Sequence, residues 1–321
     1  MRTITLEEHF NSPRYVEETS KVEGETANAY MAAMAAKLGE VGEERIADMD
    51  AAGIDVQVLS LTGIRMDALD AATGTSVARD SNDWVAAKVE AYPGRFAAFA
   101  ALGMKEPDKA ADELVRCCRD LGFKGAMISG TIDGAFLDHA RFTPVLEAAQ
   151  ALGVPIYVHP APPPVSVREA YFSGLPDGYG LALSMAGWGW HVETGLHALR
   201  MIAGGVFDRF PRLQVIVGHM GENLPFSIAR AEGVFANAGR PLQRPASEYL
   251  TSNFYVTTSG YFTTPPFLCA LMVMGADRLM FSIDYPFSTN ARGRAFLDSL
   301  PVSPADKEKI AHVNAERLLR L

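Results

Sequence analysis

Short runs of β-branched and aromatic residues alternate with longer stretches of helical period along most of the chain. This alternation is typical of βα units that build a parallel sheet. We expect eight strands, at residues 3–6, 55–60, 96–102, 125–129, 156–159, 214–219, 254–258 and 278–284. The pattern therefore predicts an α/β fold, a (β/α)8 TIM-type barrel.

Glycines follow three of the expected helices directly and support this repeat. Gly53, Gly122 and Gly153 each stand between the end of a helical stretch and the start of the next strand. A glycine in the left-handed conformation is the usual residue just past a helix, where it turns the chain back. Three such joints favour repeated βα units over a mixed fold.

Two segments are too long for a minimal barrel connection. Residues 11–48, after the first strand, have a helical pattern and predict an inserted helical segment. Residues 160–190, after the fifth strand, begin Pro-Ala-Pro-Pro-Pro and end Trp-Gly-Trp, and we expect them to form a lid loop. Long loops after barrel strands lie over the carboxyl-terminal face and shape the active site. We expect one barrel domain over residues 1–321.

Composition and charge exclude several classes of partner. The 321 residues carry 29 basic and 38 acidic side chains, a net charge of −9, and no Lys/Arg-rich run, so no nucleic acid is expected as a partner. The first ten residues contain two carboxylates and a histidine, and no apolar run reaches the roughly 18 residues of a spanning helix. We expect a cytoplasmic protein with no membrane partner. The three cysteines have neither a disulfide nor a zinc-knuckle spacing.

Acid and imidazole residues recur where the expected strands end. Glu7 and His9 close the first strand, His159 the fifth, His219 the sixth and Asp284 the eighth. In a barrel the carboxyl ends of the strands share one cleft, so residues scattered along the chain meet there. Any one of them alone could be an ordinary hydrogen-bonded polar residue. Together they indicate a site, because unpaired polar groups are costly to bury.

Four of these residues are the expected ligands of one divalent metal ion per subunit. Glu7 and His9 are two apart and project to the same side of an extended chain, while Glu8 points away. With His159 and Asp284 they offer two imidazoles and two carboxylates, which suit Zn²⁺ or Mn²⁺, and the sequence does not choose between these. The other histidines lack such spacing: His139, His191, His197 and His312. Of these, His191 follows Trp188-Gly-Trp190 and has the cleft as an alternative position, but none is assigned a role in the site.

The segments around these residues resemble the amidohydrolase superfamily. They are Leu-Glu-Glu-His-Phe, Tyr-Val-His-Pro, Val-Gly-His-Met-Gly-Glu-Asn-Leu-Pro-Phe and Phe-Ser-Ile-Asp-Tyr-Pro-Phe. Within the superfamily they are similar to the metal-dependent, non-oxidative aromatic acid decarboxylases, which act on 2,3-dihydroxybenzoate, γ-resorcylate or 5-carboxyvanillate. Hydrolases of the superfamily typically begin with His-x-His, whereas the decarboxylase branch carries glutamate first, as Glu7 does here.

The resemblance implies further site residues. His219 and Glu222 would form a catalytic pair beside the metal, with Glu222 on the first turn of a helix. Arg230 would lie near the substrate, as would Ser129, where the dihydroxybenzoate enzymes tend to carry asparagine. Each has an ordinary alternative: Glu222 would favour the helix dipole, and Arg230 would be a surface cation.

We therefore expect a carboxy-lyase that decarboxylates an ortho-hydroxylated benzoate, a small aromatic acid. The metal would chelate the carboxylate and the phenolic oxygen, Asp284 would protonate the ring carbon, and His219, oriented by Glu222, would act on the phenol. The resemblance also implies a homodimer or homotetramer. The alternative enzyme is a hydrolase of an amide or lactone that uses a metal-bound water, and a third alternative is a metal-free binding barrel.

Overall fold

The computed structural model describes the backbone of residues 1–22, 29–239 and 242–321. A strand lies at each of the eight expected positions: β1 Ile4–Phe10, β2 Val56–Leu61, β3 Phe96–Ala98, β4 Ala126–Ser129, β5 Ile156–His159, β6 Val215–Val217, β7 Phe254–Thr257 and β8 Leu279–Met280. All the paired strands are parallel, in the orders β1-β2-β3 and β4-β5-β6-β7-β8. The expectation of an α/β fold with parallel sheets is confirmed.

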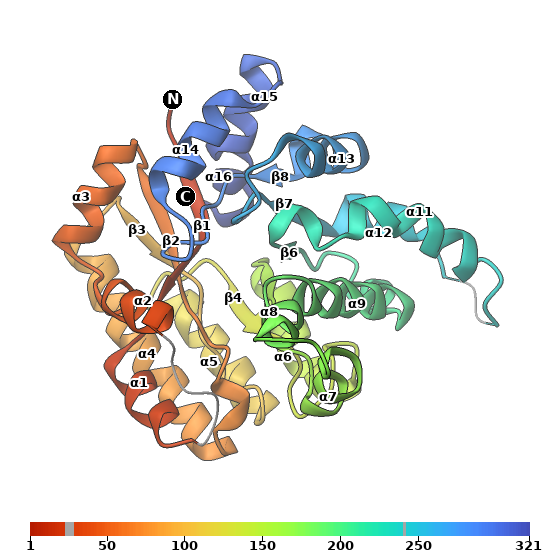
Figure 1. The fold of residues 1–321 in the computed structure, drawn as a ribbon, viewed down its shortest axis with the longest axis horizontal. Coiled ribbons are helices and arrows are strands. Elements are labelled where there is room, and N and C mark those ends of the chain that lie inside the picture. Colours follow the sequence, from red (N-terminus) through yellow and green to blue (C-terminus); the bar gives the residue numbers. More distant parts are fainter. Residues whose placement is uncertain (23–28, 240–241) are drawn as a thin grey trace.

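Isolated parallel bridges link the two sheets on both sides. Ala100 bridges Ala126 at the start of β4, and Glu8 of β1 bridges Tyr285 after β8. Figure 1 shows the strands near the centre of the molecule and the helices around them in chain order. Each strand is thus followed by at least one helix that packs outside the sheets.

Sixteen α-helices surround the strands in the described part of the chain. Their bounds are α1 Pro13–Ser20, α2 Ala29–Gly39, α3 Glu43–Ala52, α4 Ala71–Ala91, α5 Pro107–Asp120, α6 Thr143–Leu152, α7 Val165–Phe172, α8 Tyr179–Ser184, α9 Gly189–Ala203, α10 Val206–Arg209, α11 Leu224–Phe235, α12 Ala246–Asn253, α13 Thr264–Met274, α14 Asn290–Ser299, α15 Pro304–Glu308 and α16 Asn314–Leu319. The segment after β1 contains α1, α2 and α3, and residues 23–28 of it lie outside the described residues. No described helix is long and apolar enough to cross a membrane.

Two helices end at glycines, as the sequence pattern predicts. Gly53 ends α3 and Gly153 ends α6, and both have left-handed backbone conformations, with φ of 68° and 65°. Their N–H groups bond the last helical carbonyls, and the next strand begins within a few residues.

A β-bulge in β1 sets the direction of the first site residues. Ile4 and Thr5 pair with Val56 and Gln57, but the register then shifts, so that Glu8 pairs with Leu59. A bulge inserts one extra residue and turns the following side chains to the opposite face. Ile4 and Leu6 pack in the apolar cluster between the strands, and the shift turns Glu7 and His9 to that same face. Glu8 faces the other way, as predicted.

The last strand is shorter than the pattern predicts. Residues 278–284 were expected to extend, but β8 covers Leu279–Met280 only. Phe281 N donates instead to Ile310 O, and Ile283 N donates to the carboxylate of Glu8. Because these N–H groups have partners outside the ladder, the chain leaves the sheet before it reaches Asp284.

Candidate functional site

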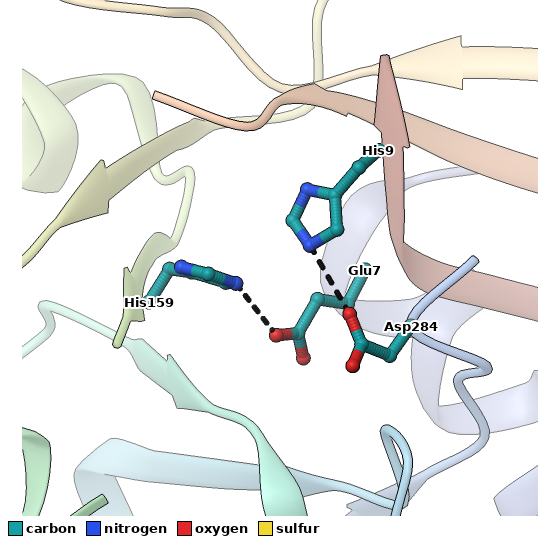
Figure 2. Close-up of side chains that lie close together, drawn as sticks. All are labelled: Glu7, His9, His159 and Asp284. Carbon is teal, nitrogen blue, oxygen red and sulfur yellow. Dashed lines mark ion pairs between the residues drawn. The ribbon is translucent and has the colours of Figure 1, made fainter. Parts of the chain in front are cut away.

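Four acid and imidazole side chains converge above the ends of β1, β5 and β8. Glu7 and His9 come from β1, His159 is the last residue of β5, and Asp284 follows β8. Each offers a ligand-type atom, and these atoms all lie within 4.8 Å of one another. Figure 2 shows the side chains pointing toward a common point. The structure therefore brings together all four of the expected metal ligands.

Two atoms of this cluster are buried without a hydrogen-bond partner, Oε1 of Glu7 and Nε2 of His9. Oε1 of Glu7 lies 3.1 Å from Nε2 of His159, and Nε2 of His9 lies 3.3 Å from Oδ1 of Asp284. These are ion-pair distances without hydrogen-bond geometry. Unpartnered buried polar atoms are costly, so the arrangement suits a cation bound between them. Imidazole nitrogens and carboxylate oxygens are ligands of Zn²⁺ and Mn²⁺.

Hydrogen bonds orient both imidazoles for this purpose. Nδ1 of His159 lies 2.7 Å from the carbonyl oxygen of Pro160, which only accepts, so Nδ1 carries the proton and Nε2 presents a lone pair to the cluster. Nδ1 of His9 lies 3.2 Å from Oγ of Ser60 on β2. Such contacts to the second ring nitrogen fix the orientation of metal-binding histidines.

A buried hydroxyl group holds the other oxygen of Glu7. The Tyr157 hydroxyl donates to Oε2 of Glu7 and lies 2.8 Å from Oγ1 of Thr257. Burial and the charge of Glu7 raise the pKa of Tyr157 well above its ordinary value, so the phenol keeps its proton. At Gly218 a Cβ would lie 2.6 Å from Oε2 of Glu7, which leaves room only for glycine. Tyr157 was not predicted as a site residue, although it precedes His159 by two residues and must share its face.

The charges of the cluster favour ionised carboxylates and a neutral imidazole. Burial acts to raise the pKa of Glu7, but His219, His159 and His9 outweigh it and hold that pKa below its ordinary value. Burial likewise opposes ionisation of Asp284, but the neighbouring imidazoles of His219 and His9 outweigh it and lower the pKa of Asp284. Burial lowers the pKa of His9 itself. These are the protonation states that a metal ion requires of its ligands.

A second group, His219, Glu222 and His191, adjoins the first. Nδ1 of His219 lies 2.7 Å from Oε1 of Glu222, and Nδ1 of His191 lies 2.7 Å from Oε2. On its other side, Nε2 of His219 lies 3.7 Å from Oδ2 of Asp284. Burial acts to lower the pKa of His219, but Glu222 and Glu7 outweigh it and hold that pKa well above its ordinary value. His219 therefore carries a proton next to Asp284.

The backbone around this pair is strained. Residues 219–223 all have positive φ, between 48° and 87°, although four of the five are not glycine. Glu222 therefore precedes α11, which begins at Leu224, and the expected position on the first turn of a helix is wrong. A left-handed conformation costs free energy in residues with a Cβ and persists where the surroundings enforce it. Here the side chain of Glu222 is held by His219 and His191.

His191 had no assigned role in the sequence, and its pairing with Glu222 was not predicted. It lies on α9 and is separated from Glu222 by 31 residues, so no local spacing connects the two. Gly195, one turn further along α9, is the available signal: a Cβ there would lie 2.5 Å from the carbonyl oxygen of Glu222. Glycine within a helix often marks a close backbone approach. It shows that α9 packs directly against the strained turn.

Known proteins resemble this chain over nearly its whole length. The chain matches the family model described as Amidohydrolase over residues 9–321. The chain belongs to the amidohydrolase family. A γ-resorcylate decarboxylase from Polaromonas sp. is 35% identical over 329 residues, which cover 99% of this chain and 98% of the relative.

Two solved structures extend the comparison to three dimensions. A dihydroxybenzoic acid decarboxylase from Polaromonas sp., solved with manganese and the inhibitor 2-nitroresorcinol, has a TM-score of 0.91 at 34% identity and covers 100% of this chain and 97% of that one. A 5-carboxyvanillate decarboxylase from Sphingomonas paucimobilis has a TM-score of 0.92 at 34% identity, over 100% of this chain and 99% of that one. These relatives confirm the predicted resemblance and the predicted enzyme class, a carboxy-lyase of the amidohydrolase superfamily.

The two expected substrate contacts of this amidohydrolase lie in different surroundings. Ser129 ends β4, pairs in register with His159, and lines a pocket with residues that follow β2 and β3, among them Gly63, Met66 and Lys105. The four ligand-type residues do not line this pocket. Ser129 connects the pocket to the cluster, because it lines the pocket and pairs with His159. Arg230 lies on α11 with an exposed side chain, outside the buried cluster of its own chain.

The expected lid of the amidohydrolase, residues 160–190, begins at the cluster and returns to it. Pro160 accepts the hydrogen bond from His159, and the helices α7 and α8 follow. Near its end, the carbonyl oxygen of Ala186 lies 3.0 Å from Nε2 of His191. Tyr171 and Tyr179, between these two anchors, are largely exposed.

Proposed function

We propose that this chain catalyses the metal-dependent, non-oxidative decarboxylation of an ortho-hydroxylated benzoate. The observation that carries the proposal is the convergence of Glu7, His9, His159 and Asp284, with buried unpartnered atoms directed at one point. The decarboxylases that resemble the chain over nearly its whole length support the reaction and the substrate class.

We propose one Zn²⁺ or Mn²⁺ ion per subunit, held by these four residues. When bound, such an ion supplies Lewis-acid stabilisation of negative charge to the substrate carboxylate and the neighbouring phenolic oxygen. The manganese in a solved relative supports this assignment. The proton transfers are proposed to be carried out by the side chains around the substrate.

Asp284 is proposed to give a proton to the ring carbon that bears the carboxylate. The bond between that carbon and the carboxylate then breaks, its electron pair returns to the ring, and CO₂ leaves. Because its pKa is lowered, Asp284 must first take up a proton. His219 carries one, and its Nε2 lies 3.7 Å from Oδ2 of Asp284. His219, oriented by Glu222, would in turn recover a proton from the phenol.

We propose that Ser129 and Arg230 contact the substrate and that residues 160–190 cover it. The position of Ser129 beside His159, at the edge of a pocket, supports the first contact. Arg230 is proposed on the family pattern alone. The two anchors of residues 160–190, at His159 and at His191, support the role of this segment as a lid.

We also propose that residues 1–321 form a single (β/α)8-barrel domain that assembles as a homodimer or homotetramer in the cytoplasm. The bridges on both sides of the two sheets support closure of the barrel. The family resemblance supports the assembly, and analytical ultracentrifugation measures it.

Elemental analysis of the purified protein, combined with a panel of hydroxybenzoates and detection of CO₂, tests the proposed function. We expect about one equivalent of zinc or manganese, and CO₂ from benzoates with a hydroxyl group next to the carboxylate. The matched 3- and 4-hydroxy isomers should release none. Cleavage of amides or lactones without CO₂ release from any benzoate would overturn the proposal in favour of a hydrolase.

A further inference from the structure

Glu8 is a buried carboxylate that lies between two metal-ligand residues of the sequence but faces away from the ligand cluster. Its Oε1 accepts hydrogen bonds from Ile283 N at 2.9 Å and from Ser282 Oγ at 3.2 Å. Its Oε2 accepts from Tyr285 N at 3.2 Å. Glu8 thus binds the backbone on both sides of Asp284.

The residues after β7 bond this segment through Thr258 and Gly260, but on the β1 side it has little other support. β8 ends at Met280, and one backbone hydrogen bond, from His9 N to Tyr285 O at 2.7 Å, joins β1 to the residues around Asp284. Asp284 has a φ of 67°, a left-handed conformation that residues with a Cβ disfavour. Such a conformation persists only where the surroundings enforce it. Glu8 accepts hydrogen bonds from the N–H groups on both sides of Asp284, and these bonds restrain the left-handed conformation of Asp284.

We infer that Glu8 is a positioning residue, whose carboxylate replaces the missing β1–β8 ladder and holds the Asp284 side chain over Glu7 and His9. The inference rests on the proposed metal site. Glu8 itself is not a ligand, because the bulge in β1 directs it to the opposite face.

A buried cation belongs to the same network. Burial raises the pKa of Glu8 to about 7, and the guanidinium of Arg45, which is also buried, acts to lower it. Its Nη1 donates to the carbonyl oxygen of His9 at 2.8 Å, and the group lies 4.7 Å from the centroid of the Tyr285 ring. Arg45 and Glu8 therefore hold the two chain segments that carry His9 and Asp284.

Glu8→Gln is the sharpest variant, since it keeps the size of the side chain and removes one acceptor. The amide oxygen can still accept from Ile283 N, but the amide N–H₂ then faces Tyr285 N–H, and two donors cannot bond each other. Glu113→Gln is the matched control. Glu113 is also buried and bonds Asn82 and Arg116, but it lies on α5, away from the cluster.

The experiment measures Mn²⁺ binding to metal-depleted full-length protein by titration and by the electron paramagnetic resonance spectrum of the bound ion. We expect Glu8→Gln to weaken Mn²⁺ binding about 10- to 100-fold, the usual effect of removing an outer-shell partner, and to change the spectrum. Glu113→Gln should bind Mn²⁺ as the wild type does, even if it unfolds at a lower temperature. Equal affinity and an identical spectrum for folded Glu8→Gln would overturn the inference.

A second variant decides the matter if Glu8→Gln does not fold. Ser282→Ala removes the Oγ that donates to Glu8 and accepts from Glu7 N at 2.8 Å. We expect a weakening of Mn²⁺ binding that is smaller than for Glu8→Gln, and unchanged binding would overturn the inference. If the wild-type protein itself binds no Mn²⁺ or Zn²⁺, it is the proposed function that fails.

Discussion

His191 and Glu222 are joined by a hydrogen bond of 2.7 Å across 31 residues of sequence. The carboxylate of Glu222 thereby has one imidazole on each oxygen, and its second partner, His219, is the one that faces Asp284. His191 comes from α9, at the end of the proposed lid, so the orientation of His219 depends on where that helix lies.

Replacement of His191 should therefore reduce turnover without affecting metal content. His191→Phe keeps a ring of similar size but leaves Oε2 of Glu222 buried without its partner, and we expect kcat to fall about 10-fold, at the lower end of the effect of losing an outer-shell hydrogen bond. His191→Asn, whose amide can donate in place of Nδ1, should recover part of the loss. Steady-state kinetics on the three proteins measure this, and wild-type kcat in His191→Phe would contradict it.

Asp284→Asn should largely abolish decarboxylation while the fold and much of the bound metal remain. The amide keeps the shape and one coordinating oxygen but has no carboxylic proton, and the loss of a positioned general acid costs about 10²–10⁴-fold in rate. In D₂O the variant should also fail to place deuterium on the ring carbon that carried the carboxylate, as mass spectrometry or NMR would detect. Asp298→Asn, an exposed position on α14, is the control. Near-normal turnover in Asp284→Asn would make His219 the proton donor.

Metal content should depend on His159. His159→Ala removes an imidazole whose Nδ1 is already committed to Pro160 O and whose Nε2 faces the cluster. We expect the metal-to-protein ratio, measured by inductively coupled plasma mass spectrometry, to fall well below one. His139→Ala, an exposed histidine, should retain the wild-type ratio. Full occupancy and activity in His159→Ala would remove this residue from the ligand set.

A buried histidine away from the site should make stability depend on pH. Nε2 of His197 accepts a hydrogen bond from Leu137 N, and burial lowers its pKa from 6.5 to about 4. Because the unfolded chain binds this proton more tightly, the contribution of His197 to stability is complete above pH 6.5. It is lost as the pH falls toward 4, by about 3 kcal/mol in all.

His197→Gln keeps an acceptor for Leu137 N and removes the titrating group. We expect the free energy of unfolding, measured with urea between pH 7 and pH 4, to fall less steeply in this variant than in the wild type. His139→Gln, at an exposed position, should leave the wild-type slope unchanged. An equal slope in His197→Gln would assign the acid sensitivity to other groups.

The positions of the strands could be read from the sequence because each strand combines apolar periodicity with a stop signal. Gly53 and Gly153 ended their helices where expected. Glu7, His9 and His159 lie on β1 and β5 as expected, whereas Asp284 lies four residues beyond the end of β8. These features depend on neighbours along the chain. The alternation of side chains also predicted that Glu8 would face away from Glu7 and His9, which the structure confirms.

The features that escaped prediction depend on residues far apart in sequence. The strained turn displaces Glu222 from the start of α11, and no propensity predicts five consecutive left-handed residues. The pairing of His191 with Glu222 and that of Glu8 with Ile283 and Tyr285 arise from packing between distant segments. Tyr157 is the exception, since its place two residues before His159 made it accessible to the same argument that found Glu7 and His9.

The offset in β1 also limits how this part of the protein can evolve. Leu6 and Glu7 are adjacent in sequence. Leu6 packs in the apolar cluster between the strands, whereas Glu7 belongs to the polar ligand cluster. Loss of a single codon between Thr5 and Glu8 would restore plain alternation. Deletion of Leu6 would remove a side chain from the apolar cluster between the strands, and deletion of Glu7 would remove a proposed metal ligand. A deletion in this part of β1 therefore removes either core packing or a residue of the site.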